Sequence, residues 1–274
     1  MKLANLKIYI RTFGCQMNEY DANAIYQHLR QKGCAFSDSI NNADIVIIET
    51  CSVRQKAEDK VLGLLGMLCK RKRAKGLPFI VVGGCMAERM KEDLSLRFPE
   101  ISLIVGPGHV DNIADKILKI IESDENKTLI ETGFEDNAPF LYKKGMYEEY
   151  SSVKAFVTAV RGCTNFCSYC IVPFVRGPEK SRNSDEILTE INELTQNGVK
   201  EITLLGQNIN IYGKDLLPAM SFTELLKEIL LEQFCAILQI FLFLHFYNSK
   251  NLLERVANLL DIHPSISRTL GVFF

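Results

Sequence analysis

The chain is organised around Lys154–Cys170, KAFVTAVRGCTNFCSYC, an apolar run that leads directly into three closely spaced cysteines. The apolar residues 153–160 predict a β-strand. Cys163, Cys167 and Cys170 follow it with the spacing C-x-x-x-C-x-x-C. Three thiolates on one short loop can hold three irons of a 4Fe–4S cube, which leaves the fourth iron open to a ligand that is not protein. An open iron indicates chemistry rather than a purely structural site.

A structural zinc loop is the main alternative for these cysteines. Zinc sites of that kind normally take four ligands from two pairs of residues, and no second pair lies nearby in the sequence. A few buried thiols without any metal are the other alternative. We favour an iron–sulfur cluster because the spacing and the preceding strand match that chemistry better.

Length and composition limit the remaining choices. The 274 residues suffice for two domains. With 32 Lys plus Arg against 33 Asp plus Glu, the chain has no global electrostatic preference for nucleic acid, so any RNA affinity must come from a local patch or another module. The N-terminus has no apolar signal core, so we expect a cytoplasmic protein without a membrane segment. In a reducing cytosol its nine cysteines are available as metal ligands.

The N-terminal part alternates apolar strands with helices. The pattern predicts strands at residues 7–12, 44–50, 79–82 and 102–105, and it predicts that Asn18 caps the first helix. Such alternation is typical of a parallel, Rossmann-like α/β sheet, in which all strands end at the same edge.

A second cysteine triplet follows from this topology. Cys15, Cys51 and Cys85 each come a few residues after one of the first three predicted strands. We therefore expect the sheet to gather them at its C-terminal edge as a second three-thiolate metal site, although incidental loop cysteines are the alternative. Three further cysteines lack this placement and are predicted to be buried or idle thiols: Cys34, Cys69 and Cys235.

We predict two domains, residues 1–122 and 153–274, joined by a polar, acidic linker at 123–152 that lacks periodicity. The second domain is expected to be a partial (βα) barrel.

Within the second domain, Ser184 is expected to cap a helix, and a later strand runs into Gly206, Gln207 and Asn208. Polar groups at the end of a barrel-type strand lie where βα enzymes keep their sites, although ordinary turn chemistry explains the two amides equally well. Further on, Ser221–Glu224 forms a capping box, and Phe234–Phe246 is apolar but too short to span a membrane. A helix is predicted at 251–260.

Together, these motifs resemble the radical S-adenosylmethionine (SAM) methylthiotransferases over residues 5 to about 230. The stretches that carry the resemblance are TFGCQMN at 12–18, ETCSVR at 49–54, VGGCMA at 82–87, RGCTNFCSYCIVP at 161–173, RG at 176–177, SR at 181–182 and LLGQN at 204–208. The first stretch favours family members that modify dimethylallyladenosine in tRNA over relatives that act on threonylcarbamoyladenosine or on a ribosomal protein.

The resemblance implies roles for both triplets. Cys163, Cys167 and Cys170 would bind the 4Fe–4S cluster that cleaves SAM, and Cys15, Cys51 and Cys85 would bind an auxiliary 4Fe–4S cluster that carries the sulfur to be inserted. One SAM would methylate that sulfur, and a second would yield the radical that lets it replace hydrogen on ring carbon 2 of the adenine.

The resemblance also implies the remaining ligands and partners. Tyr169 would contact the SAM adenine through its backbone, and Gly206, Gln207 and Asn208 would line the SAM side of the barrel. No side chain is assigned a catalytic role. The expected partners are tRNA and an electron donor such as a flavodoxin or ferredoxin, and the chain is expected to be a monomer.

Two features depart from the family pattern. Asn183 stands where the family usually has proline, and the pattern degrades from about residue 231. We therefore expect a truncated or frame-shifted copy that lacks the later barrel strands and the C-terminal module that grips tRNA. An inactive fragment is thus one alternative function. An electron carrier is disfavoured because it would use four cysteines per cluster.

Overall fold

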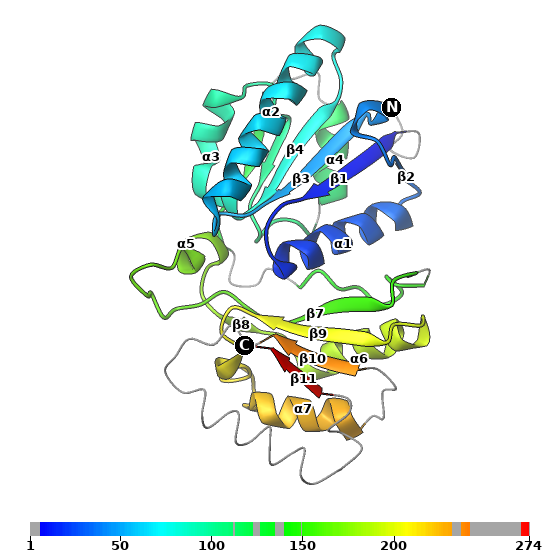
Figure 1. Cartoon of the computed structure of the whole chain (residues 1–274), viewed down its shortest axis with the longest axis vertical. Coiled ribbons are helices and arrows are strands. Elements are labelled where there is room, and N and C mark those ends of the chain that lie inside the picture. The colour runs from blue at the N-terminus through cyan, green and yellow to red at the C-terminus, as the bar shows by residue number, and fades with distance from the viewer. Residues whose placement is uncertain are drawn as a thin grey trace. The chain divides into compact units, whose positions relative to one another are not determined.

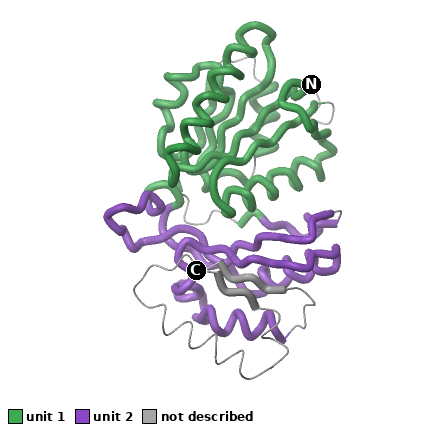
Figure 2. Tube along the Cα trace, viewed as in Figure 1, with its two compact units in different colours: residues 1–141, 174–176 green, residues 142–173, 177–274 purple. Residues whose placement is uncertain are grey.

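The computed structural model describes residues 6–111, 113–122, 127–134, 140–148, 150–231, 237–241 and 270–273. The chain divides into two compact units (Figure 2). Unit 1 comprises residues 1–141 with 174–176, and unit 2 comprises residues 142–173 with 177–274. Both units combine helices with largely parallel sheets, which confirms the α/β class.

Unit 1 is built on a six-stranded parallel sheet of order β2-β1-β3-β4-β5-β6 (Figure 1). Its strands are β1 (Lys7–Thr12), β2 (Ala35–Phe36), β3 (Ile45–Thr50), β4 (Phe79–Gly84), β5 (Leu103–Val105) and β6 (Leu129–Glu131). The chain leaves β1 toward β2 and then returns past β1 to β3, from which it runs on to β6. The winding direction therefore reverses between β1 and β3, which makes this position the switch point of a doubly wound sheet.

Helices cover both faces of this sheet. The helical elements are α1 (Gln16–Gln31), the short 3-10 helix η2 (Ile40–Asn42), α2 (Gln55–Lys75), α3 (Cys85–Arg97) and α4 (Ile113–Glu122). Every residue of β3 is buried. Its alternate residues Val46 and Ile48 join a core with α2 and α3, as do Ile80 and Val82 of β4. Because side chains alternate across a strand, Ile45 and Ile47 face the other side, where α1 and α4 contact each other.

Unit 2 contains a five-stranded sheet of order β11-β10-β9-β7-β8, in which only β8 is antiparallel to its neighbour. Its strands are β7 (Lys154–Arg161), β8 (Lys180–Ser181), β9 (Glu201–Gly206), β10 (Ile237–Phe241) and β11 (Leu270–Phe273). The helical elements are α5 (Val172–Arg176), whose last three residues group with unit 1, α6 (Ser184–Gln196), η3 (Ile209–Ile211) and α7 (Phe222–Leu231). The repeated strand–helix units match the expected partial barrel.

The predicted linker contains regular structure. Its residues Leu129–Glu131 form β6, which extends the sheet of unit 1 by pairing with β5. Further along, Glu193 of α6 accepts hydrogen bonds from the Tyr142 hydroxyl at 2.7 Å and from the Gly145 amide at 3.0 Å. The predicted linker range 123–152 thus contains a strand and side-chain contacts, which come from the tertiary structure rather than from local periodicity.

Two predicted helix caps were also wrong. Asn18 lies inside α1, where it is buried and its amide donates to the Thr50 carbonyl at 2.5 Å. Asn183, not Ser184, caps α6 by accepting a hydrogen bond from the Asp185 amide at 2.9 Å. Asparagine at position 183, where the family usually has proline, is thus a favourable N-cap for α6. The capping box of Ser221 and Glu224 is confirmed, with reciprocal bonds of 2.7 and 3.2 Å.

Some C-terminal predictions lie outside the described residues, namely Cys235 and the helix at 251–260. Within the predicted apolar run, residues 237–241 form β10. In the described part of the chain, no helix combines the length and apolar character needed to cross a bilayer.

Candidate functional site

The first triplet (Cys15, Cys51 and Cys85) follows three adjacent strands of unit 1. Cys15 precedes α1 after β1, Cys51 directly follows β3, and Cys85 opens α3 directly after β4. Adjacent strands lie about 4.8 Å apart, so the three strand ends cover about 10 Å. Cys15 and Cys51 flank the switch point between β1 and β3, where doubly wound sheets bind ligands. The structure thus brings Cys15, Cys51 and Cys85 to the C-terminal edge of the sheet, where their positions after three strands place them.

The three thiols influence one another. The Cys51 thiol donates a hydrogen bond to the Cys15 sulfur, which lowers the pKa of Cys15 to about 6 and raises the pKa of Cys51. Burial raises the pKa of Cys85, and the nearby Arg176 guanidinium opposes this effect. The site therefore favours a thiolate at Cys15, and the thiolate is the form of cysteine that binds metal.

Glycines allow the loops of the first triplet to pack closely. At Gly14, where φ is +129°, an added Cβ would overlap Cβ of Cys51. At Gly84, where φ is +89°, it would lie 2.5 Å from the Thr50 carbonyl oxygen. Both positions therefore require glycine for conformation and for space. These are the glycines that precede Cys15 and Cys85 in the sequence motifs.

Buried charged groups surround the first triplet. The Arg176 guanidinium donates to Asp21 Oδ2 at 2.8 Å and to Asn18 Oδ1 at 2.9 Å, and it also hydrogen-bonds the Cys85 sulfur. Glu49 of β3 is fully buried, and neither of its carboxylate oxygens has a hydrogen-bond partner in the described structure. Burial, reinforced by Asp21, raises the pKa of Glu49 well above its usual range.

Sequence reasoning did not identify these charged groups as site residues. Arg176 and Glu49 entered only as parts of motifs, and Asp21 was not singled out. The one available signal was a charged residue, Glu49, in the apolar strand that directly precedes Cys51.

The first triplet fits a group larger than one ion. No three His, Cys, Asp or Glu side chains in the described ranges are arranged to hold a single metal ion. In a cube of four irons each thiolate binds a different iron, so the ligands are spread more widely. Three free thiols from adjacent strand ends, beside one buried guanidinium, form a donor set suited to such a cluster.

The second triplet (Cys163, Cys167 and Cys170) surrounds one depression in unit 2. This depression is shallow and partly open to solvent. The residues that line it are Cys163, Asn165, Phe166, Cys167, Cys170, Val172, Pro173 and Gln207. Burial raises the pKa of the Cys163 thiol, and the negative charge of the nearby Cys170 and Cys167 thiolates raises it further. Three thiols around one open depression also fit a three-ligand cluster with an exposed fourth iron.

Contacts from β9 and α5 fix the second cysteine loop. The Gly162 amide donates to Gln207 Oε1 at 2.6 Å, and the Cys163 amide donates to the Gly177 carbonyl at 3.0 Å. Gly162 has φ of +78°, and a Cβ there would overlap the Pro178 carbonyl. Gln207 therefore positions the loop as well as lining the depression.

The other predicted cofactor residues lie in different surroundings. Gly206 is buried, and an added Cβ would lie 2.5 Å from Val160, so its role in the fold is close packing. Asn208 precedes η3, and Tyr169 is 79% exposed. Neither Asn208 nor Tyr169 lines the depression. Of the four predicted SAM contacts, Gln207 lines the depression, and Tyr169 lies in the cysteine loop itself, directly before Cys170.

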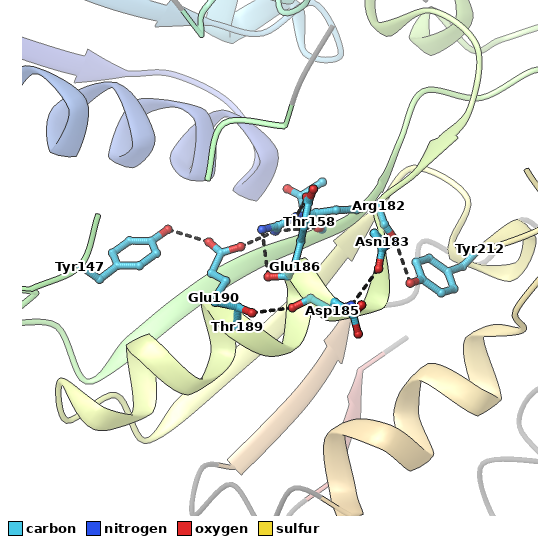
Figure 3. A network of polar contacts seen from close by, with 9 residues as sticks. All are labelled: Tyr147, Thr158, Arg182, Asn183, Asp185, Glu186, Thr189, Glu190 and Tyr212. Carbon is cyan, nitrogen blue, oxygen red and sulfur yellow. Dashed lines mark hydrogen bonds and ion pairs between the residues drawn. The ribbon is translucent and has the colours of Figure 1, made fainter. Parts of the chain in front are cut away.

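A buried polar network lies beside the sheet of unit 2 (Figure 3). Arg182 and Glu190 form an ion pair in which both side chains are 0% exposed. The Tyr147 hydroxyl donates to Glu190 Oε1 at 2.8 Å, and the Tyr212 hydroxyl donates to the Arg182 carbonyl at 2.8 Å. Because Arg182 also donates to the Thr158 carbonyl of β7 at 3.4 Å, the network ties α6 to β7. The Ser-Arg motif therefore contributes to the fold.

Comparison with protein families gives two matches. Residues 7–106 match the uncharacterized protein family UPF0004, and residues 157–262 match the radical SAM superfamily. The first range contains the first triplet, and the second contains the second triplet.

Curated proteins give longer matches. The chain is 41% identical over 229 residues to a tRNA-2-methylthio-N(6)-dimethylallyladenosine synthase from Syntrophus aciditrophicus, covering 84% of this chain and 49% of that protein. It is also 41% identical over 228 residues to the synthase of the same name from Clostridium botulinum, covering 81% of this chain and 49% of that protein. The chain thus spans about half the length of the curated relatives it matches.

Solved structures support the fold. The radical SAM methyltransferase TsrM from Kitasatospora setae, with tryptophan and a SAM analogue bound, aligns with a TM-score of 0.58 at 14% identity, covering 93% of this chain and 57% of that one. The cobalamin-dependent radical SAM enzyme OxsB aligns with a TM-score of 0.53 at 15% identity, covering 92% of this chain and 41% of that one.

Proposed function

Because the chain belongs to the radical SAM methylthiotransferase family, we propose that it acts in converting dimethylallyladenosine beside the tRNA anticodon to its 2-methylthio derivative. The gathering of Cys15, Cys51 and Cys85 at the ends of three adjacent strands beside the switch point carries this proposal, because SAM cleavage alone needs only the second triplet. A second three-thiolate site provides a place for the inserted sulfur.

The proposed cofactors are SAM and two 4Fe–4S clusters, one at each triplet. When bound, the cluster at the second triplet would supply the electron that cleaves SAM, and the one at the first triplet would carry the sulfur to be inserted. Radical chemistry suits this substrate because the C–H bond at adenine carbon 2 is unactivated and no general base could ionise it.

The residues of the chain then have distinct tasks. The six cysteines hold the two groups, and Gln207 holds the loop of the second triplet through the Gly162 amide. Gly14 and Gly84 let the loops of the first triplet approach each other. Tyr169, Gly206 and Asn208 remain proposed SAM contacts. We further propose a cytoplasmic monomer that receives electrons from a flavodoxin or ferredoxin.

Iron content tests the two-cluster part of the proposal. Anaerobic reconstitution of the full chain should give about eight irons, two cubes of four. Replacing either triplet by alanine should leave about half of the iron. The control variant with both Cys34→Ala and Cys69→Ala, which changes neither triplet, should keep all of the iron. Retention of all the iron after loss of the second triplet would contradict two separate sites.

Product analysis tests the reaction. Reconstituted protein is incubated with dimethylallylated tRNA, SAM, sulfide and dithionite, and the nucleosides are separated by mass spectrometry. A variant that lacks the second triplet should no longer cleave SAM to 5′-deoxyadenosine, whereas a variant that lacks the first should still do so. The 2-methylthio product should form only when both triplets are present. A methylthio product from threonylcarbamoyladenosine tRNA, but not from dimethylallylated tRNA, would assign the chain to another branch of the family.

A further inference from the structure

We propose that Arg176 is a positioning residue of the first triplet and that its charge raises the reduction potential of the cluster bound there. This inference rests on the proposed function, because it assumes that the first triplet binds a cluster. Arg176 lies in sequence just after the second triplet, yet it groups with unit 1.

The first turns of α1 hold Arg176 in place. Cys15 is the N-cap of α1, and Asn18 and Asp21 follow at spacings of three residues, so all three lie on one side of the helix. Arg176 binds both Asn18 and Asp21, and the Arg176 and Asp21 side chains are only 6% and 9% exposed. The guanidinium is therefore fixed at the helix end that carries Cys15.

Asn18 joins this arrangement to the sheet. Its amide donates to the Thr50 carbonyl at 2.5 Å, directly before Cys51, and its Oδ1 lies 3.5 Å from the Cys15 sulfur. Arg176 meanwhile hydrogen-bonds Cys85. The pair of Asn18 and Arg176 thus contacts, or lies directly beside, all three cysteines of the first triplet.

The charge of Arg176 is permanent, because a guanidinium is not deprotonated in proteins. A cluster held by thiolates becomes more negative when it is reduced. A buried cation that donates to a ligand sulfur stabilises that reduced state and therefore raises the potential. Asp21 adds negative charge nearby and opposes the effect. Glu49 adds none while it is neutral, the form that its raised pKa favours. Removing the charge of Arg176 and removing the charge of Asp21 should therefore shift the potential in opposite directions.

The test uses the full chain with Cys163, Cys167 and Cys170 all replaced by alanine, so that only the first triplet can bind a cluster. Reduction is followed by electron paramagnetic resonance at controlled potentials. Arg176→Met should lower the ratio of reduced to oxidised cluster at the original midpoint at least about tenfold, a shift of about 59 mV for one electron. Arg176→Lys keeps the charge and should restore most of that ratio, and Asp21→Asn should raise the midpoint.

Lys32→Gln is the matched control. It removes the same unit of charge from the far end of α1, about 24 Å away at 1.5 Å per residue, where Lys32 makes an exposed ion pair with Asp115. The midpoint should not move. An unchanged midpoint in Arg176→Met, or the same direction of shift in Arg176→Met and Asp21→Asn, would overturn the inference. Absence of iron from the parent triple variant would instead refute the proposed function.

Discussion

Replacing Glu190 by glutamine should destabilise unit 2 strongly. The substitution keeps the shape of the side chain but removes the buried carboxylate that pairs with Arg182, which is 0% exposed. The second ion pair of Arg182, with Glu186 at 3.2 Å, remains, but Glu186 is 58% exposed and compensates the buried charge less well. If Arg182 were removed instead, Glu190 could become neutral by taking up a proton, because burial raises its pKa. A guanidinium cannot lose its charge in this way. Removing one partner of a buried pair costs about 3–5 kcal/mol, a large part of the stability of a typical domain.

Urea denaturation followed by circular dichroism measures this cost. With a slope of about 2 kcal/mol per molar urea, the midpoint of the affected transition should fall by about 2 M. Glu201→Gln is the control in the same unit, because Glu201 pairs with Lys154, which is 69% exposed. That pair should contribute less than about 1 kcal/mol. A midpoint for Glu190→Gln no lower than that of Glu201→Gln would refute the reasoning.

Three further predictions concern the loops and the domain boundary. Gln207→Ala leaves the buried Gly162 amide without its hydrogen-bond acceptor, at a cost of about 1–3 kcal/mol. Reconstituted iron should therefore fall from about eight atoms per chain toward four, because only the first triplet keeps its cluster. Full iron content in this variant would contradict the role of Gln207. In the metal-free chain, the rate of alkylation of Cys15 should reach half its maximum near pH 6. Cys51→Ala should move that midpoint to higher pH, because it removes the hydrogen bond that most lowers the pKa of Cys15. Mass spectrometry of the labelled peptides measures both midpoints. A chain ending at residue 122 lacks β6 and exposes the edge of β5, so thermolysin should digest it faster than a chain ending at residue 141; equal digestion rates would show that β6 adds nothing to unit 1.

Two strands of unit 1 were closely predicted from sequence. β1 begins and ends at the predicted residues, and β3, which is buried along its whole length, differs by one residue at its start. Continuous apolar runs leave no alternative face to solvent, so local sequence specifies such strands well. β6 was missed because it has only three residues, and its stability comes from pairing with β5 rather than from its own pattern.

The gathering of the first triplet also followed from sequence, because topology alone places the ends of parallel strands together. The charged groups beside it did not. Arg176 is 155 residues from Asp21, and nothing local to either residue indicates the pair. Asn18 was read as a cap because asparagine often caps helices. Its actual partner, the Thr50 carbonyl, is 32 residues away and is known only from the fold.

The origin of the first triplet on three separate strands affects how the protein matures. Residues 15 and 85 are 70 positions apart, so the site does not exist in a nascent chain until β1, β3 and β4 have emerged from the ribosome and paired. Any group that needs all three thiols must therefore be delivered to a folded sheet, and its binding free energy then adds to the stability of that sheet. If that group is the proposed iron–sulfur cluster, a cell short of iron would accumulate a less stable unit 1, and the degradation rate of the protein would report on cofactor supply.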